Sequence, residues 1–107
     1  MNNRLIATDL IIDLAKKTIE VERDAIAKLT TLLTVDFADA VNCIIESKGR
    51  VIISGIGKSA IIATKIVATL NSTGTPAIFM HAGDAIHGDL GTIQENDVVI
   101  CISNSGN

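Results

Sequence analysis

The sequence predicts an α/β domain with a parallel β-sheet, preceded by two N-terminal helices. Three apolar runs without polar alternation, at residues 51–54, 77–80 and 98–102, are typical of parallel strands buried on both faces. A helical pattern between the first two runs predicts a βαβ unit. Residues 1–50 carry seven Lys or Arg and eight Asp or Glu, whereas residues 51–107 carry two Lys and four acids. We therefore assign the first segment to the helices and the second to the α/β core.

Composition narrows the class of protein. A chain of 107 residues that is 48% hydrophobic and 20% charged excludes a disordered segment and allows one core. The absence of Trp and Tyr and a net charge of -3 argue against a nucleic-acid partner. No apolar run approaches the length of a membrane span and the N-terminus lacks a signal-peptide pattern, so we expect a cytoplasmic protein with no membrane partner. Cys43 and Cys101 lack metal-ligand spacing and are predicted to be core thiols.

The first helix is expected to begin at Thr8 and Asp9, and the second follows a break at Thr34 and ends before Gly49. An apolar stripe with steps of three or four, interrupted by Glu22, marks one face of the first helix: Ile12, Ala15, Ile19, Ile26, Leu29 and Leu33. The corresponding face of the second helix holds Phe37, Val41, Ile44 and Ile45. Such a stripe either packs into the core of its own chain or meets a partner chain, and the sequence leaves both open.

A third helix is expected over residues 59–73, where Ile62, Ile66 and Leu70 have helical spacing. The connection from Met80 to Asp97 is rich in His, Gly and Asp and has room for a short helix at most. Its length predicts a functional loop rather than a tight link.

The segment Gly55-Ile56-Gly57-Lys58-Ser59 follows the first strand and opens the third helix, where backbone N–H groups and the helix dipole attract anions. A Walker A loop would need glycine where Ile52 stands, and the dinucleotide fingerprint is weak because residues 51–80 contain no acid. Lys58 opposes the helix dipole and has no acidic neighbour in sequence. It is either a solvated lysine or a lysine that faces an anionic, phosphorylated ligand.

The segment Ser103-Asn104-Ser105-Gly106 repeats this arrangement after the third strand. Both loops should emerge at the carboxyl edge of the sheet, where open α/β sheets bind ligands, so they predict a phosphate site, with a plain turn as the alternative for the second loop. His81 and His87 lie in the long connection at a spacing that matches no helical zinc motif. Beside a phosphate site, His87 could transfer a proton or bind a sugar hydroxyl.

Taken in order, four motifs make the sequence similar to the sugar isomerase (SIS) domain, and more narrowly to the D-arabinose 5-phosphate isomerase family, over residues 10–107. They are Gly55 to Ser59, Ser72 to Pro76, His81 to Gly91, and Ser103 to Gly106. The resemblance implies a three-layer α-β-α domain with a parallel sheet, in a homo-oligomer that is a tetramer in the family. It also implies interconversion of D-arabinose 5-phosphate and D-ribulose 5-phosphate through an enediolate, on the way to the lipopolysaccharide sugar Kdo, with no required cofactor.

By position, the resemblance implies catalytic roles for Lys58 and His87, and substrate contacts for Gly74, Thr75, His81, His87, Ser103 and Ser105. It also implies that His81 can take zinc as an inhibitory ligand. The chain departs from the family at Ala82 and Asp84, where His-Pro-Gly-Glu is common, and at Asn107, where the family has Glu.

Because family members continue through further strands and usually CBS modules, we expect this chain to be a fragment of the SIS domain that is inactive alone. Two other functions stay open. A non-catalytic SIS sensor of sugar phosphates should lack the Lys58–His87 pair, and a helical assembly module would be built on residues 8–33.

Overall fold

The computed structural model describes residues 7–86 and 88–106 and divides the chain into two compact units, one up to Ala38 and one from Asp39 onward. The first unit holds helix α1 (Thr8–Lys28) and the short 3-10 helix η1 (Leu29–Leu32). Helix α2 (Val35–Glu46) begins in the first unit and ends in the second. The division between the two units falls inside α2, between Ala38 and Asp39, and the boundary at residue 50 stays a prediction from the change in charge.

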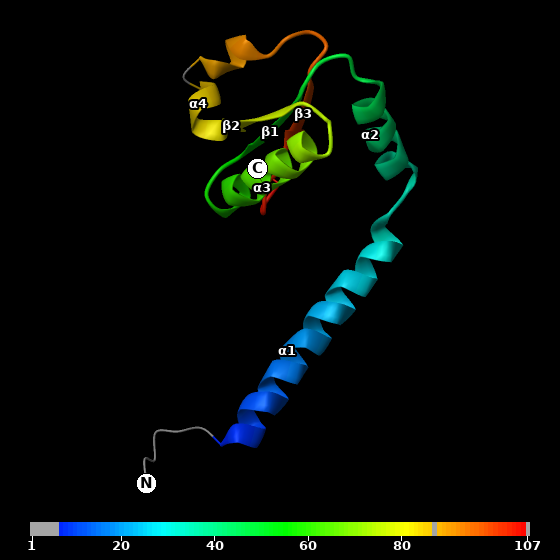
Figure 1. The fold of residues 1–107 in the computed structure, drawn as a ribbon, viewed down its shortest axis with the longest axis vertical. Coiled ribbons are helices and arrows are strands. Elements are labelled where there is room, and N and C mark those ends of the chain that lie inside the picture. Colours follow the sequence, from blue (N-terminus) through cyan, green and yellow to red (C-terminus); the bar gives the residue numbers. More distant parts are fainter. Residues whose placement is uncertain (1–6, 87, 107) are drawn as a thin grey trace. The chain divides into compact units, whose positions relative to one another are not determined.

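Helix α1, the long blue-to-cyan ribbon in Figure 1, begins at the residue predicted for it. Asp9 in its first turn and Lys28 in its last complement the helix dipole. The helix tightens into η1, where the hydroxyls of Thr30 and Thr31 donate to the carbonyls of Ala27 and Lys28 at 2.9 and 2.7 Å. Polar side chains that bond back in this way satisfy the end of the helix. No residue of α1 is buried.

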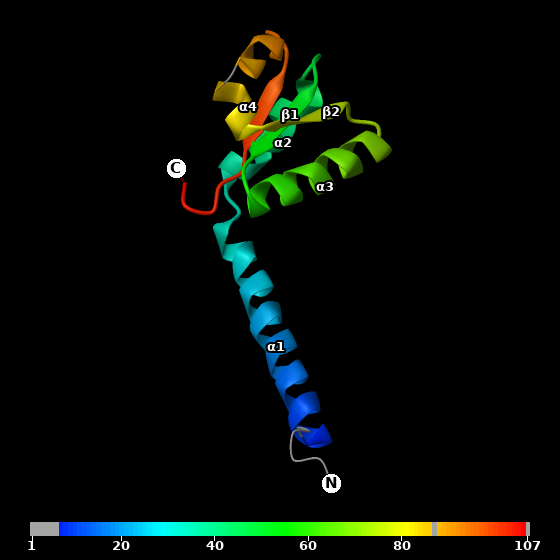
Figure 2. The same ribbon diagram turned by 90° about the vertical axis from the view of Figure 1, so that its left-hand side faces the viewer.

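The second unit contains a parallel sheet of β1 (Val51–Gly55), β2 (Ala77–His81) and β3 (Val98–Cys101) in the order β2-β1-β3. Helix α3 (Lys58–Ser72) connects β1 to β2 and lies along one face of the sheet (Figure 2). The three predicted strands and the βαβ unit are thus confirmed. Residues from β1, α3 and β2 form the core of this face: Val51, Ile53, Ala63 and Ala77.

Burial differs between the strands. In the central strand β1, Val51, Ile52 and Ile53 are fully buried, which confirms the sequence prediction for that strand. In β3, inner and outer residues alternate and Val99 is 44% exposed, so the prediction of burial on both faces is wrong there. The reason is that β3 is an edge strand and α3 packs against β1 and β2.

The two cysteines are not core thiols, contrary to the sequence prediction. Both are free and exposed. Cys43 belongs to α2, which has no buried residue, and Cys101 ends the edge strand β3. At the end of an edge strand, the Cys101 side chain has no neighbouring layer of helices or strands to pack against.

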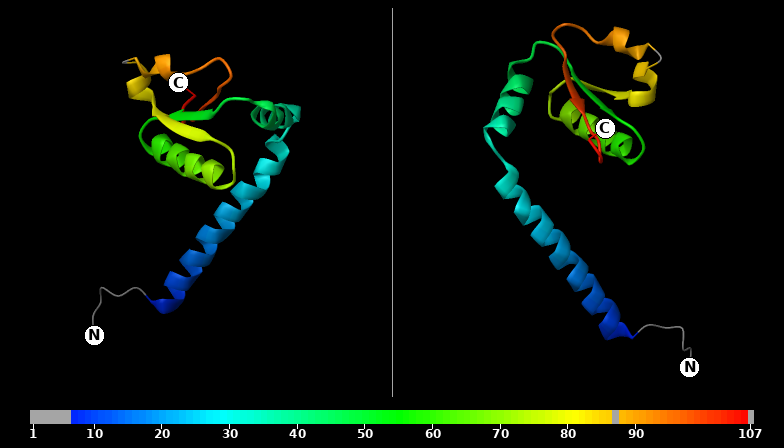
Figure 3. Two further views of the ribbon diagram at one scale, coloured as in Figure 1. Left: turned by 45° about the horizontal axis from the view of Figure 1, so that its top comes forward. Right: turned by 180° about the vertical axis from the view of Figure 1, so that it is seen from behind.

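The long connection between β2 and β3 forms two short helical segments, α4 (Ala82–Ile86) and η2 (Asp89–Thr92), which lie together beside the carboxyl end of β2 (Figure 3). The sequence predicted at most one short helix there, and the structure has the 3-10 segment η2 in addition to α4. Within residues 7–86 and 88–106, no helix is long and apolar enough to cross a membrane.

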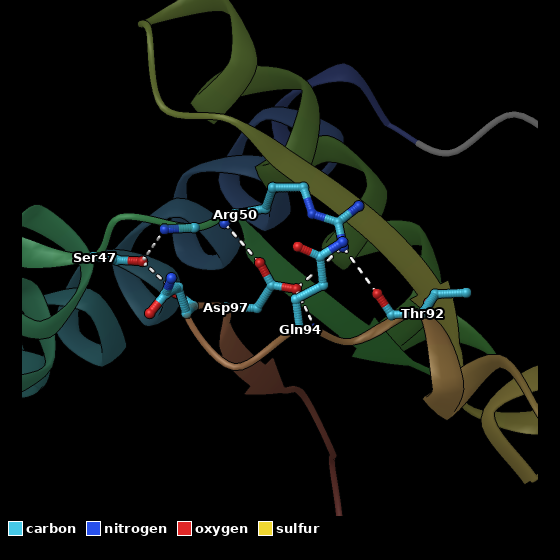
Figure 4. Close-up of polar contacts among 7 residues, drawn as sticks. Ser47, Arg50, Thr92, Gln94 and Asp97 are labelled. Atoms are coloured by element: carbon cyan, nitrogen blue, oxygen red, sulfur yellow. Dashed lines mark hydrogen bonds and ion pairs between the residues drawn. The ribbon is translucent and has the colours of Figure 1, made fainter.

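A polar cluster ties the starts of β1 and β3 together (Figure 4). The backbone N–H of Arg50 donates to Asp97 Oδ1 at 2.8 Å, and its guanidinium donates to Asp97 Oδ2 at 3.1 Å and to the Thr92 carbonyl at 3.0 Å. The Gln94 N–H also donates to Asp97 Oδ2, at 2.8 Å. These donors, led by the Arg50 side chain, lower the pKa of Asp97 to about 2.

Gly49 and Asn96 are in close contact at the amino edge of the sheet. The Ser47 hydroxyl accepts from the Gly49 N–H and donates to the Asn96 carbonyl at 3.0 Å. A Cβ on Gly49 would collide with the Asn96 carbonyl, so glycine is required there. The Asp97 side chain is only 2% exposed. The strands are therefore joined at the amino edge of the sheet by a hydrogen-bonded carboxylate that is shielded from water.

Candidate functional site

An open pocket of about 560 Å³ lies at the carboxyl ends of β1 and β3. It is lined by the end of β1 with the first turn of α3, by one residue after β2, and by the segment that follows β3: Ser54–Ile56, Lys58, Ser59, Ala82 and Cys101–Ser105. The carboxyl edge of a parallel sheet is where α/β proteins bind ligands. Both loops singled out in the sequence therefore meet at one pocket, as the parallel sheet predicted.

Two glycines shape the loop after β1. Gly55 is buried, and a Cβ there would come within 2.9 Å of the backbone C and O of Ser59. Gly57 precedes α3 with a φ of +61°, a conformation that L side chains rarely adopt. The two glycines let the strand turn directly into the helix and bring the first turn of α3 to the pocket.

The start of α3 carries positive potential. The helix begins after Gly57 without a side-chain hydrogen bond that caps it, and its first turn contains no acid. Among the described residues that line the pocket, Lys58 is the charged one, and its side chain is exposed. The helix dipole, N–H donors at the helix start and an ammonium group together suit a phosphate or another anion.

The loop after β3 supplies hydroxyl groups on the other side of the pocket. Its first residues continue the sheet, because the Ile102 N–H donates to the Ser54 carbonyl at 2.9 Å. The Gly106 N–H then donates to Ser103 Oγ at 2.9 Å, and Gly106 has a φ of +82°. This turn keeps Ser103 and Ser105 at the pocket wall.

His81 ends β2, opposite Gly55, at the same edge of the sheet. Its Nδ1 accepts the Gly83 N–H at 3.0 Å, and its ring meets the Phe79 ring edge-on at a centroid distance of 6.3 Å. With Nδ1 acting as an acceptor, the neutral ring carries its proton on Nε2. The ring is thus a hydrogen-bond donor through Nε2 in this conformation.

Gly74 and Thr75 lie at the opposite edge, in the turn that leads into the start of β2. Gly74 has a φ of +96°, and the Thr75 N–H donates to the Leu70 carbonyl at 2.8 Å. Neither residue lines the pocket. Within one chain, the structure brings Lys58, Ser103 and Ser105 together, puts His81 at the same edge, and keeps the Gly74–Thr75 pair apart.

The remaining predicted site residue, His87, lies outside the described residues. Four lining residues lie outside the two loops that the sequence singled out: Ser54, Ala82, Cys101 and Ile102. The signal for two of them was the strand register, because Ser54 and Cys101 form the last residue pair between β1 and β3. Within the described part of the chain, no three His, Cys, Asp or Glu side chains gather into a metal-binding group.

Comparison with known proteins agrees with this architecture. Over 92 residues, 86% of this chain, the sequence is 48% identical to arabinose 5-phosphate isomerase KdsD of Pseudomonas aeruginosa, of which the match spans 28%. It is also 48% identical over 99 residues, 92% of this chain, to arabinose 5-phosphate isomerase GutQ of Salmonella typhi, of which it spans 31%. The chain therefore spans under a third of these curated relatives.

A solved structure of Escherichia coli CFT073 protein c3406 in complex with arabinose 5-phosphate is similar as well, with a TM-score of 0.84 and 39% identity over 92% of this chain and 53% of that one. The family model of the SIS domain matches residues 44–107, which contain the whole sheet, α3 and every residue that lines the pocket. On its fold and on this match, the chain belongs to the SIS domain family.

Proposed function

We propose that this chain forms part of an aldose–ketose isomerase that interconverts D-arabinose 5-phosphate and D-ribulose 5-phosphate. The observation that carries the proposal is the pocket at the carboxyl edge, where the start of α3 with Lys58 faces the serine loop after β3. The names of the similar isomerases, and the arabinose 5-phosphate bound in a similar structure, support this substrate class. The reaction would serve Kdo and lipopolysaccharide synthesis in the cytoplasm.

The phosphate would bind between the two loops. The N–H groups at the start of α3 and the hydroxyls of Ser103 and Ser105 suit its oxygens, and the Lys58 ammonium offsets its charge. A neutral pentose lacks the group that this potential attracts. We therefore expect the 5-phosphate to dominate affinity.

The chemistry needs three roles. A base takes the proton from carbon 2 of the open aldose, and a cation or donor stabilises the oxyanion that forms at O1 of the enediolate. After the proton of the O2 hydroxyl passes to O1, an acid returns a proton to carbon 1 to give the ketose. Lys58 suits the second role, since it is the charged group at the pocket among the described residues that line it. His87 suits the third by its chemistry, and no residue of this chain is assigned the role of base.

Zinc at His81 stays a prediction that the described residues do not support by themselves. His81 Nδ1 already accepts the Gly83 N–H. A metal on Nδ1 would displace this hydrogen bond, and a metal on Nε2 would move the ring proton to Nδ1, which could then no longer accept it. No cluster of three metal-ligand side chains occurs within residues 7–86 and 88–106. No step of the reaction is assigned to a metal.

Calorimetric titration of this chain with D-arabinose 5-phosphate and with D-arabinose tests the binding step. We expect measurable affinity for the phosphate and none for the neutral sugar, and equal affinities would refute the proposal. Turnover is tested in a chimaera in which this chain replaces the matching segment of the P. aeruginosa isomerase. Formation of ribulose 5-phosphate is expected, whereas phosphate binding without turnover in a folded chimaera would favour a non-catalytic sensor.

A further inference from the structure

The His81 ring, at the end of β2, is held on two sides by its own chain. The 3.0 Å hydrogen bond from the Gly83 N–H to its Nδ1 caps the second residue of the short helix α4. On another side the Phe79 ring meets it edge-on, with the two ring planes at 81°. Phe79 itself packs against the core of the sheet. These contacts give the imidazole one orientation relative to β2.

Gly83 also limits the space beside this ring. A Cβ at position 83 would lie 3.1 Å from His81 Nδ1 and 3.3 Å from its Cε1, which is tighter than most side chains allow. A larger residue would therefore have to push the ring aside by a few tenths of an ångström. Gly83 does not have the positive φ that calls for glycine elsewhere in the chain. The contact with His81 is the reason that the structure offers for a glycine here.

The other ring nitrogen is available to a ligand. Because Nδ1 accepts a hydrogen bond, the neutral ring carries its proton on Nε2. No residue in the described part of the chain accepts a hydrogen bond from this Nε2–H. His81 lies opposite Gly55 in the sheet, and the next residue, Ala82, lines the pocket at this edge. A half-buried residue with an unused donor beside a pocket is suited to an oxygen of the ligand.

We propose that Gly83 is a positioning residue, which holds His81 as the Nε2–H tautomer so that this group donates a hydrogen bond to a hydroxyl of the bound sugar phosphate. The identity of that ligand rests on the proposed function. The phosphate is assigned to the loops after β1 and β3, whereas β2 lies on the other side of β1, so we assign the donor to the sugar. An oriented donor loses little conformational freedom on binding.

This arrangement makes His81 a hydrogen-bond donor and not a base. A base needs an unprotonated nitrogen, and the unprotonated nitrogen of this ring, Nδ1, already accepts the Gly83 N–H. The two experiments below test the tautomer and the contact with the sugar separately, so that the first does not depend on the proposed function.

Nitrogen-15 NMR of the histidine rings tests the tautomer without a ligand. The chain has two histidines, so His81→Asn assigns their signals. At about pH 8.5, where histidine side chains are neutral, and with a metal chelator present, we expect the Nε2–H form alone in the wild-type chain and an appreciable Nδ1–H population in Gly83→Ala. Gly91→Ala is the matched control, because a Cβ there meets nothing within 4 Å, and it should leave the tautomer unchanged.

Calorimetric titration with D-arabinose 5-phosphate and with inorganic phosphate tests the contact with the sugar. His81→Asn keeps an oxygen that can cap Gly83 and removes the Nε2–H donor. We expect the dissociation constant for the sugar phosphate to rise about three- to tenfold in this variant and in Gly83→Ala, which is the effect of one neutral hydrogen bond. The affinity for inorganic phosphate should not change. Since alanine favours a helix more than glycine does, a loss in Gly83→Ala cannot come from a weaker α4.

Four results would overturn the proposal. A wild-type ring with its proton on Nδ1 contradicts the tautomer, and a Gly83→Ala protein that matches Gly91→Ala in tautomer and affinity contradicts the role of Gly83. Full sugar-phosphate affinity in His81→Asn would mean that the ring only caps α4. An equal loss of affinity for inorganic phosphate in that variant would put the contact at the phosphate. A wild-type chain that binds no sugar phosphate would instead refute the proposed function, and with it the ligand assigned here, whereas NMR would still decide whether Gly83 sets the ring.

Discussion

Replacing Lys58 by Met separates a functional lysine from a merely solvated one, because the two roles predict different effects on ligand binding. Met keeps the length and the helix propensity of Lys and removes its charge. Lys58 is the first residue of α3, whose first turn has no acid to offset it. Removing a cation from the positive end of the helix dipole should stabilise the fold by roughly 0.3–1 kcal/mol, or about 1–8 °C in Tm.

The same change should weaken phosphate binding. A charge-assisted hydrogen bond contributes about 1.5–3 kcal/mol, so the dissociation constant for D-arabinose 5-phosphate should rise about 10- to 150-fold. Calorimetry gives the affinity and thermal unfolding gives the stability of the same protein. A matched control is Lys65→Met, which removes an exposed lysine from the middle of the same helix, away from the pocket.

The result that would refute this reasoning is a Lys58→Met protein with the phosphate affinity of Lys65→Met. A solvated lysine would give that outcome, with or without a gain in stability. If Lys58→Met instead loses stability, the side chain makes a contact that the dipole argument leaves out.

Three further predictions concern the scaffold. Ile53→Ala, at a fully buried position of β1, should lower the unfolding free energy by about 2–5 kcal/mol in urea titrations, whereas Ile61→Ala, at a position 72% exposed, should change it little; equal losses would contradict the assigned core. Gly55→Ala must shift the backbone of Ser59, so it should lower the unfolding free energy by about 1–3 kcal/mol and also weaken phosphate binding. Unchanged stability and affinity would mean that the loop has room to move. For Asp97, a pKa lowered from 3.8 to about 2 means that its contribution to stability is complete above about pH 4 and is lost as the pH falls toward 2, so acid unfolding of Asp97→Asn should lack that part of the pH dependence.

The strands and helices could be predicted from the sequence because their patterns are local. Apolar runs without alternation predicted the ends of β1, β2 and β3 to within one residue, and helical spacing predicted α3 with both ends displaced by one residue. Two of the loops that follow strands were placed correctly at one edge because parallel sheets leave no other choice.

What failed depended on neighbours that a local pattern does not contain. Val99 and Cys101 were predicted to be buried because the run around them is apolar, yet β3 is an edge strand and both side chains are exposed. The tie between Arg50 and Asp97 joins residues 47 positions apart and has no motif. Ser54 was overlooked at the pocket because its place there follows from the register with β3.

The register between β1 and β3 links the amino edge of the sheet to its carboxyl edge. Hydrogen bonds from the Val98 N–H to the Arg50 carbonyl and from the Ile102 N–H to the Ser54 carbonyl, both 2.9 Å, fix β3 against β1 at each end. A slip of one residue would turn every side chain of β3 to the other face and move the serine loop away from the start of α3. Because β3 is held by β1 alone among the described strands, the bonds of the Asp97 carboxylate to Arg50 add to the backbone bonds that define where β3 starts. The ion pair at one edge thus contributes to the spacing between Lys58 and Ser103 at the other, although it touches neither.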